Sequence, residues 1–175
     1  MVSGQNELSI RLADLTGPDA WAASRLVEAY LTHTELEKAA HLGGSGVGTA
    51  LSARYRAELD DPARAYENAQ AYLADLAGAP IGVVIVQHTA TAYELKRVWV
   101  DPTARGHRVG SALIDAALSR QDLPTRLTVW DWRDDAIRLY GRRGFVPVAS
   151  WEDRPRLLCM ERARPSTATG TPPGS

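Results

Sequence analysis

The chain has 175 residues, enough for one domain with a buried core, and its 20 basic and 21 acidic side chains nearly cancel. This balance argues against a nucleic-acid partner, because such proteins normally carry a basic excess or a basic stripe. The single cysteine, Cys159, is typical of a reducing compartment. The sequence has no basic N-terminal segment followed by an apolar run, and no stretch approaching about eighteen apolar residues. We therefore expect a cytoplasmic protein with no membrane partner.

The first third of the chain predicts one strand and two helices. Residues 8–12 alternate apolar and polar side chains, which indicates a strand. Apolar residues at helical spacing predict a helix from Asp19 to about His33. The glycine-rich residues 41–48 follow a helix rather than a strand, so we interpret them as a loop and not as a phosphate cradle. A second helix is expected over residues 49–59, before Asp60-Asp61-Pro62.

The middle of the chain predicts an antiparallel meander. Residues 70–76 and 81–88 are extended runs joined by Ala77-Gly78-Ala79-Pro80, and residues 91–100 form the third strand. A helix from about Arg108 to Arg120 then leads to a strand over residues 126–130. Because this crossover passes through a helix, we expect the strands on either side of it to be parallel.

The C-terminal part predicts a helix and two further strands. The helix covers residues 134–143, and the strands cover residues 145–149 and 156–161. Residues 164–175 contain too little apolar surface to pack, so we predict a disordered tail after a single domain over residues 1–163.

A strand, a turn and a glycine-bearing loop precede the helix that begins near Val109. Unpaired N–H groups and the helix dipole at such a helix start favour a bound phosphate or diphosphate. Three residues separate Gly106 from Gly110, and Ser111 follows without a lysine, so the loop is not a P-loop. Arg108 excludes the dinucleotide fingerprint as well.

The segment Arg105-Gly106-His107-Arg108-Val109-Gly110 resembles the diphosphate loop of the GNAT superfamily of acyl-CoA-dependent N-acyltransferases, Arg/Gln-x-x-Gly-x-Gly/Ala. Arg105 and Gly110 match its ends, whereas Arg108 stands in place of the middle glycine. An arginine there would either crowd the diphosphate or add a cationic contact to it.

A second segment, residues 130–145, resembles the later motif of the same superfamily, Asn-x-x-Ala-x-x-x-Tyr-x-x-x-Gly-Phe. Ala136, Tyr140 and Gly144-Phe145 are in register, and Arg133 replaces the asparagine. The two motifs stand in the family's order, about twenty-five residues apart. The resemblance covers roughly residues 8–162.

The resemblance implies an α/β fold of GNAT type, with a mixed, mostly antiparallel sheet of six to seven strands flanked by about four helices. It also implies direct transfer of an acetyl or related acyl group from acyl-CoA to an amine, with acetyl-CoA as co-substrate, no metal ion, and a homodimer. A small-molecule amine is the expected acceptor, since the near-neutral charge does not indicate a peptide groove. Two alternatives stay open: a donor bound to a carrier protein, and a non-catalytic module that binds acyl-CoA.

Donor binding is assigned by the same resemblance. In the family, the strand before the loop parts from the next parallel strand and pairs with the donor's pantetheine arm. The expected donor-binding residues are Val98, Trp99, Val100, Arg105, Gly106, His107, Arg108, Val109, Gly110, Ser111, Arg133, Ala136, Tyr140 and Arg143.

Tyr140 is the residue that we expect to protonate the departing thiolate. A phenol with a pKa near 10 is a weak acid, but it can donate to a thiolate whose ordinary pKa is about 8.5. Its spacing alone favours a core tyrosine on the apolar face of an amphipathic helix, whereas the motif register favours the catalytic role.

Glu94 is the expected general base or water-orienting residue. An alkylamine with a pKa of about 10.4 needs roughly 4.6 kcal/mol to become neutral at pH 7, so the carboxylate would need burial or a water chain. Glu94 shares strand parity with Val98 and Val100 and stands where many family members carry a glutamate. The alternative is a surface carboxylate beside Lys96 and Arg97.

Aromatic and acidic side chains cluster near the expected acceptor mouth. Trp130 is predicted to pack in the core, and Trp132 to form an aromatic wall for the acceptor. Asp131 and the pair Glu152-Asp153 are second choices for acceptor contacts.

Overall fold

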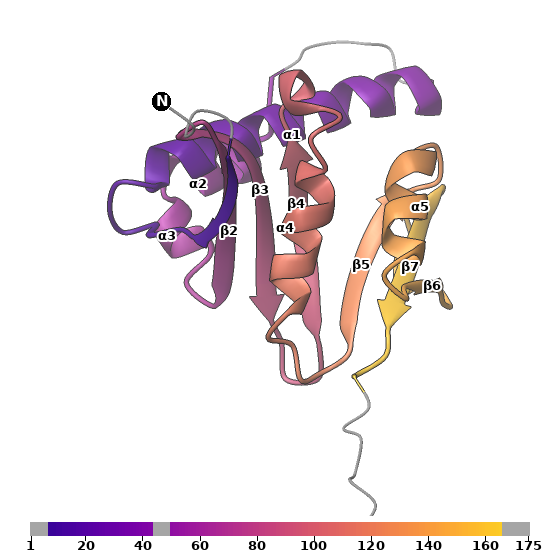
Figure 1. Ribbon diagram of the computed structural model, residues 1–175. Coiled ribbons are helices and arrows are strands. Elements are labelled where there is room, and N and C mark those ends of the chain that lie inside the picture. The colour runs from indigo at the N-terminus through magenta and orange to yellow at the C-terminus, as the bar shows by residue number, and fades with distance from the viewer. Residues whose placement is uncertain (1–6, 44–49, 166–175) are drawn as a thin grey trace, which may run out of the picture.

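The computed structural model describes residues 7–43 and 50–165. Its strands form one sheet in the order β1-β2-β3-β4-β5-β7-β6, and only β4 and β5 pair in parallel (Figure 1). This arrangement confirms the mixed, mostly antiparallel α/β class. The strands are β1 Leu8–Leu12, β2 Ala69–Leu76, β3 Ala79–His88, β4 Tyr93–Val100, β5 Thr125–Trp130, β6 Val146–Pro147 and β7 Leu157–Arg162.

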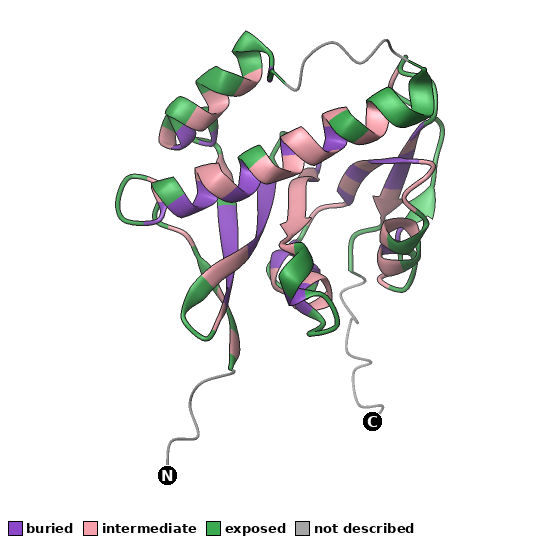
Figure 2. Cartoon of the chain, turned by 90° about the horizontal axis from the view of Figure 1, so that it is seen from above, coloured by how far each residue is buried: buried purple, intermediate pink, exposed green. Residues whose placement is uncertain are grey.

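Helices cover both faces of the sheet, with α1 to α3 on one face and α4 and α5 on the other (Figure 2). The described part of the chain has one more α-helix than predicted, the short α3, which begins at Pro62 where the preceding helix was expected to stop. The helices are α1 Ala20–Leu42, α2 Ala53–Asp60, α3 Pro62–Ala65, α4 Val109–Leu118 and α5 Asp134–Gly141, with a 3₁₀ turn at Pro102–Ala104.

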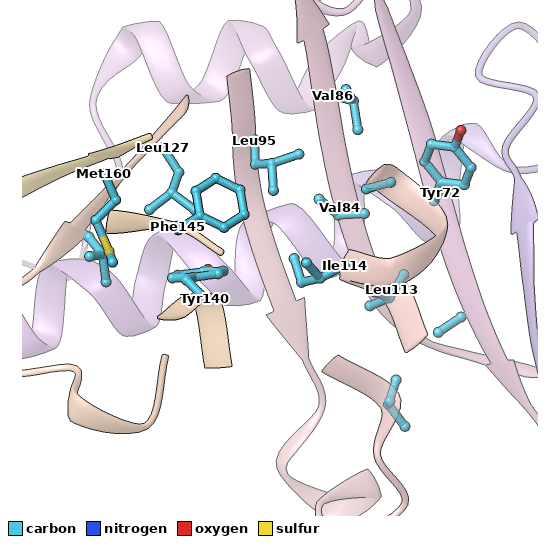
Figure 3. Close-up of a cluster of buried hydrophobic side chains, with 14 of the residues drawn as sticks. Tyr72, Val84, Val86, Leu95, Leu113, Ile114, Leu127, Tyr140, Phe145 and Met160 are labelled. Carbon is cyan, nitrogen blue, oxygen red and sulfur yellow. The ribbon is translucent and has the colours of Figure 1, made fainter. Parts of the chain in front are cut away.

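Two apolar layers hold the helices to the sheet. The layer beneath α4 and α5 joins Leu113 and Ile114 to the β-sheet and, further along, to Tyr140 and Phe145 (Figure 3). The layer beneath α1 centres on Leu26 and its neighbours from β2 and β3. Helices α4 and α5, which carry the two sequence motifs, therefore share one core with β4 and β5, and this core fixes the positions of the two motifs relative to each other.

Strands β4 and β5 separate after two paired positions. Tyr93 pairs with Thr125 and Glu94 pairs with Arg126, and no further pair joins these two strands. Strand β4 continues along β3 as far as Val100, whereas β5 continues along β7, so the two strands diverge toward their C-terminal ends (Figure 1). The predicted parting of the parallel strands is confirmed, and it leaves a backbone edge of β4 without a strand partner.

A β-bulge at Arg97 changes the side-chain alternation of β4. Trp99 pairs with Val83 and Lys96 pairs with Ile85, so one residue of β3 opposes two residues of β4. Arg97 takes the extra position with a φ of 54°. Leu95 consequently shares the α4 face with Val98 and Val100, and the predicted parity of Glu94 with those two valines is wrong.

Several boundaries differ from the predictions because polar contacts outweigh the apolar pattern. Helix α1 continues well past His33, since its second half is held by ion pairs such as Lys38–Glu35, and it ends at Gly43 with a φ of 68°. Helix α2 begins only at Ala53, where the Ser52 hydroxyl accepts a hydrogen bond from the Tyr55 backbone N–H. Strand β6 is only two residues long. Most of the glycine-rich stretch (44–49) and most of the predicted tail (166–175) lie outside the described residues.

Across residues 7–43 and 50–165, no helix combines the length and the apolar character that crossing a membrane requires. The same residues contain no cluster of three or more His, Cys, Asp and Glu side chains arranged to hold a metal ion.

Candidate active site

A groove of about 990 Å³ passes through the gap between β4 and β5. Helices α1 and α2 wall it on one face of the sheet, and the loop before α4 together with α5 walls it on the other. The structure brings together about half of the predicted site residues along this groove. They are Glu94, Val98, Val100, Arg105, Gly110, Arg133, Ala136 and Tyr140.

The other predicted donor-binding side chains do not line the groove. Trp99 lies on the α1 face, where its ring is 5.2 Å from the ring of His33. Val109 is buried in the core beneath α4. The other predicted donor-binding residues that do not line the groove are the exposed Gly106, His107 and Arg108 and the half-buried Ser111 and Arg143.

The loop before α4 reverses direction through two left-handed residues. Gly106 has a φ of 85°, and Arg108, the residue that caps α4, has a φ of 57° with no side-chain cap. The side chain of Arg108 is exposed to solvent and stands away from the groove wall. A left-handed residue at this position explains why the family pattern has glycine there, since a side chain makes this conformation costly.

The left-handed conformation of Arg108 predicts a stability difference between two variants. Arg108→Gly and Arg108→Ala remove the same cation, but only glycine adopts the left-handed conformation without a steric cost. We expect Arg108→Gly to be more stable than Arg108→Ala by about 1 kcal/mol in urea unfolding. Equal stabilities would show that the loop is not held in this conformation.

Gly110 lies in the first turn of α4 on the groove wall. A Cβ atom built on it would lie 3.6 Å from Leu139 Cδ2 and 3.8 Å from Val100 Cγ2, which are ordinary contact distances. The packing of the protein itself therefore does not require glycine at this position.

The Tyr140 phenol is buried, with only 7 % of the residue exposed, and it lies on the groove wall against the ring of Phe145, 5.9 Å away. Burial raises the pKa of Tyr140, and the neighbouring Tyr30 adds to the rise, while Arg133 opposes it. The phenol is therefore protonated at neutral pH. It can donate a proton but is not a general base.

The two arginines of the second motif tie α5 to its neighbours. Arg133 Nη2 lies 2.6 Å from Glu37 Oε2 and donates to Thr34 Oγ1 at 2.8 Å, so it links the start of α5 to α1. Arg143 Nε lies 2.7 Å from Asp115 Oδ1, which links α5 to α4. Burial raises the pKa of the Glu37 carboxyl, but the hydrogen bond and charge of Arg133 outweigh it, so that the pKa is lowered.

Glu94 lies at the closed end of the gap, at the last residue that pairs β4 with β5. It lines the groove, its side chain is 32 % exposed, and its Oε2 lies 3.5 Å from Lys96 Nζ. Glu94 is therefore a groove residue that also pairs with Lys96, and its role as a general base stays a prediction.

A cluster on the α1 face was not predicted from the sequence. Arg97 donates to both oxygens of Glu58, at 2.7 and 2.9 Å, and the Tyr66 hydroxyl donates to the same carboxylate. The Arg97 guanidinium also lies over the rings of Tyr30 and Tyr55, at 5.8 and 5.5 Å. These residues come from α1, α2, β4 and the C-terminal cap of α3, and the bulge turns Arg97 toward the others, so no local pattern could reveal the cluster.

The two tryptophans near the mouth differ in outcome: Trp130 is buried, as predicted, with 5% of the residue exposed, whereas Trp132 does not line the groove as predicted. Trp130 lines the groove, whereas Trp132 is stacked between Trp130 and His41, with ring centroids 4.7 and 4.5 Å apart. Of the acidic second choices, Asp131 pairs with Arg156 and lies away from the groove wall. Glu152 lines the groove and pairs with Arg154.

Residues 67–147 match the family model of an acetyltransferase (GNAT) domain. This segment belongs to the GNAT family. It includes strands β2 to β6, helices α4 and α5, and both motifs recognised in the sequence, so the resemblance is confirmed. Helices α1 and α2, which form the other wall of the groove, precede the matched GNAT segment.

The described part of the chain has the GNAT fold of several solved structures. A protein described as histone acetyltransferase HPA2 and related acetyltransferase, from Corynebacterium glutamicum, aligns with a TM-score of 0.65 and 22% identity over 92% of this chain and 98% of that one. A GNAT-family acetyltransferase from Staphylococcus aureus aligns with a TM-score of 0.61 and 16% identity, over 90% of this chain and 99% of that one. The PaiA N-acetyltransferase of Thermoplasma acidophilum, solved with coenzyme A, aligns with a TM-score of 0.61 and 15% identity, over 90% of this chain and 99% of that one. No curated protein sequence matches the chain.

Proposed function

We propose that this protein is an N-acyltransferase that moves an acetyl or related acyl group from acyl-CoA to a primary amine of a small molecule, directly and in a ternary complex. One observation carries the proposal: a single groove connects the start of α4, at Arg105 and Gly110, with the protonated phenol of Tyr140. The fold is shared with an N-acetyltransferase solved with coenzyme A, which supports the same donor.

The donor would occupy the α4 side of the groove. Backbone N–H groups at the start of α4 suit its diphosphate, and Arg105 adds a cation on the groove wall. The edge of β4 that faces the gap has free backbone groups along Val98 to Val100, which suit the amide-bearing pantetheine arm as an added strand.

The transfer itself requires one bond to form and one to break. The amine nitrogen attacks the thioester carbonyl carbon, a C–N bond forms, and the C–S bond breaks. Tyr140 then supplies a proton to the thiolate sulfur, and the attacking nitrogen gives up a proton through water toward Glu94. Solvent carries a proton from Glu94 back to the Tyr140 phenolate, which restores both groups. Because both substrates lie in one groove, no covalent enzyme intermediate is needed.

Release of free thiol from acetyl-CoA in the presence of a panel of primary amines tests this proposal. Amine-dependent release supports it. Release that never exceeds the amine-free rate, together with thermal protection by CoA, would indicate a binding module. Failure of CoA to protect the fold would favour a carrier-protein donor.

Gly110→Ala tests whether Gly110 is needed for donor binding rather than for the stability of the fold. A methyl group meets only ordinary contacts within the protein, and alanine favours a helix over glycine by about 1 kcal/mol, so the variant should be at least as stable as the wild type. In the groove, the same methyl group narrows the approach to the diphosphate. We expect the KM for acetyl-CoA to rise about tenfold. A stable variant with an unchanged KM would place the diphosphate elsewhere.

A further inference from the structure

The α1 side of the groove holds an excess of one positive charge. Arg97 pairs with Glu58, and Arg133 pairs with Glu37. A third guanidinium, that of Arg54 on α2, lines the same wall, and no carboxylate of residues 7–43 and 50–165 lies within ion-pair distance of it. Three cations thus face two carboxylates.

The other charged groups on this wall cancel in pairs. Lys38 Nζ lies 2.9 Å from Glu35 Oε1, and Lys96 Nζ lies 3.5 Å from Glu94 Oε2. The surplus positive charge therefore belongs to Arg54, Arg97 and Arg133. The Glu58 carboxylate pairs with Arg97 and also feels the charge of Arg54.

The paired arginines also keep hydrogen-bonding capacity. The Arg97 and Arg133 guanidinium carbons lie 5.8 and 5.5 Å from the centre of the Tyr30 ring, so they flank one tyrosine on the groove wall. Their bonds to Glu58, Glu37 and Thr34 use Nε and Nη2 of each. Within the described residues, Nη1 of each has no side-chain partner.

We propose that the acceptor amine also carries an anionic group, a carboxylate or a phosphate, which binds at Arg54 beside Arg97 and Arg133. A guanidinium suits both oxyanions because its N–H groups match their geometry, and one anion removes the surplus charge of the wall. An acceptor with a second ammonium would instead add a cation to a wall that is already positive. This inference rests on the proposed function and specifies its substrate class.

The anion site and the donor site lie on opposite faces of the sheet. Arg54 comes from α2 on the α1 face, whereas Arg105 and Gly110 come from the loop and helix of the α4 face. An effect of Arg54 on the acceptor is therefore separable from an effect on the donor phosphates.

The test compares acceptors that differ only in the anion. With the full chain, acetyl-CoA and a thiol-release assay, kcat/KM is measured for L-phenylalanine against phenethylamine and for O-phosphoethanolamine against ethanolamine. We expect the anionic member of at least one pair to be favoured at least tenfold, and the pair that shows the preference identifies carboxylate or phosphate. Arg54→Gln should lower that preference about tenfold, and Arg54→Glu should reverse it.

Arg56→Gln is the matched control, because Arg56 lies on the same helix but lines a separate hollow of about 440 Å³ between α1 and α2. It should keep the preference. Turnover of amines with no preference for the anionic member would overturn the inference and leave the proposed function intact. A rise in the KM for acetyl-CoA in Arg54→Gln, with the preference unchanged, would assign Arg54 to the donor and also overturn it. Absence of both turnover and acetyl-CoA binding would refute the proposed function, and the inference with it.

Discussion

Replacing Tyr140 with phenylalanine should lower kcat about 100-fold and change the KM for acetyl-CoA by less than about threefold. The hydroxyl is the only group removed, and general acids of this kind typically contribute two to four orders of magnitude. The ring stays in place against Phe145, so the packing of α5 is preserved. The measurement is steady-state kinetics with acetyl-CoA and the best amine of the panel.

The pKa of Tyr140 gives this prediction a pH dependence. Because burial raises the pKa above the ordinary value of 10.0, the phenol stays protonated across pH 7 to 10. Wild-type kcat should therefore show no loss from phenol ionisation in that range. Tyr72→Phe is the matched control, since Tyr72 is a buried tyrosine of the same core layer but lies away from the groove. Equal turnover in both variants would remove Tyr140 from the chemistry.

Replacing Arg97 with methionine should destabilise the protein by about 3 kcal/mol, because it leaves the carboxylate of Glu58 inside the protein without its partner. The two side chains are only 19% and 12% exposed, so solvent can replace little of the lost interaction. Urea unfolding at pH 7 measures the effect. Arg138→Met is the control, because Arg138 belongs to a surface ion pair with a fully solvated aspartate, and we expect no measurable change.

The double variant Arg97→Met/Glu58→Leu removes both members of the ion pair. It should recover much of the stability lost in Arg97→Met, since an apolar pair leaves no buried charge. A double variant no more stable than Arg97→Met would contradict this account.

The stability of the wild type should also depend on pH. Burial raises the pKa of Glu58, but hydrogen bonds from Arg97 and Tyr66 lower it more, so the wild type should lose stability as the pH falls below about 4.5.

Local patterns were sufficient to predict most of the sheet and to place parts of both motifs along the groove. Strands β1 to β5 follow from alternation and turn residues. The start of α4 and the place of Tyr140 follow from spacing within two short motifs, whose parts are close in the chain. The crossover helix also predicted that β4 and β5 would be parallel.

The α1 side of the groove could not be predicted in the same way, because its contacts join distant residues. Arg133 meets Glu37 across 96 positions of the chain, and Arg97 meets Glu58 across 39. The bulge at Arg97 reversed the expected parity of Glu94, and no residue type in β4 signals it. Trp132 was misplaced for a related reason, since its stacking on His41 depends on where the long helix α1 ends.

A crystal structure with acetyl-CoA bound would decide where the donor lies. We expect the diphosphate within hydrogen-bond distance of the backbone N–H groups of residues 105–111, with the pantetheine arm along the free edge of β4. We also expect the thioester sulfur within hydrogen-bond distance of the Tyr140 hydroxyl. A donor bound outside the gap between β4 and β5, or a thioester separated from this phenol by intervening side chains, would contradict these expectations.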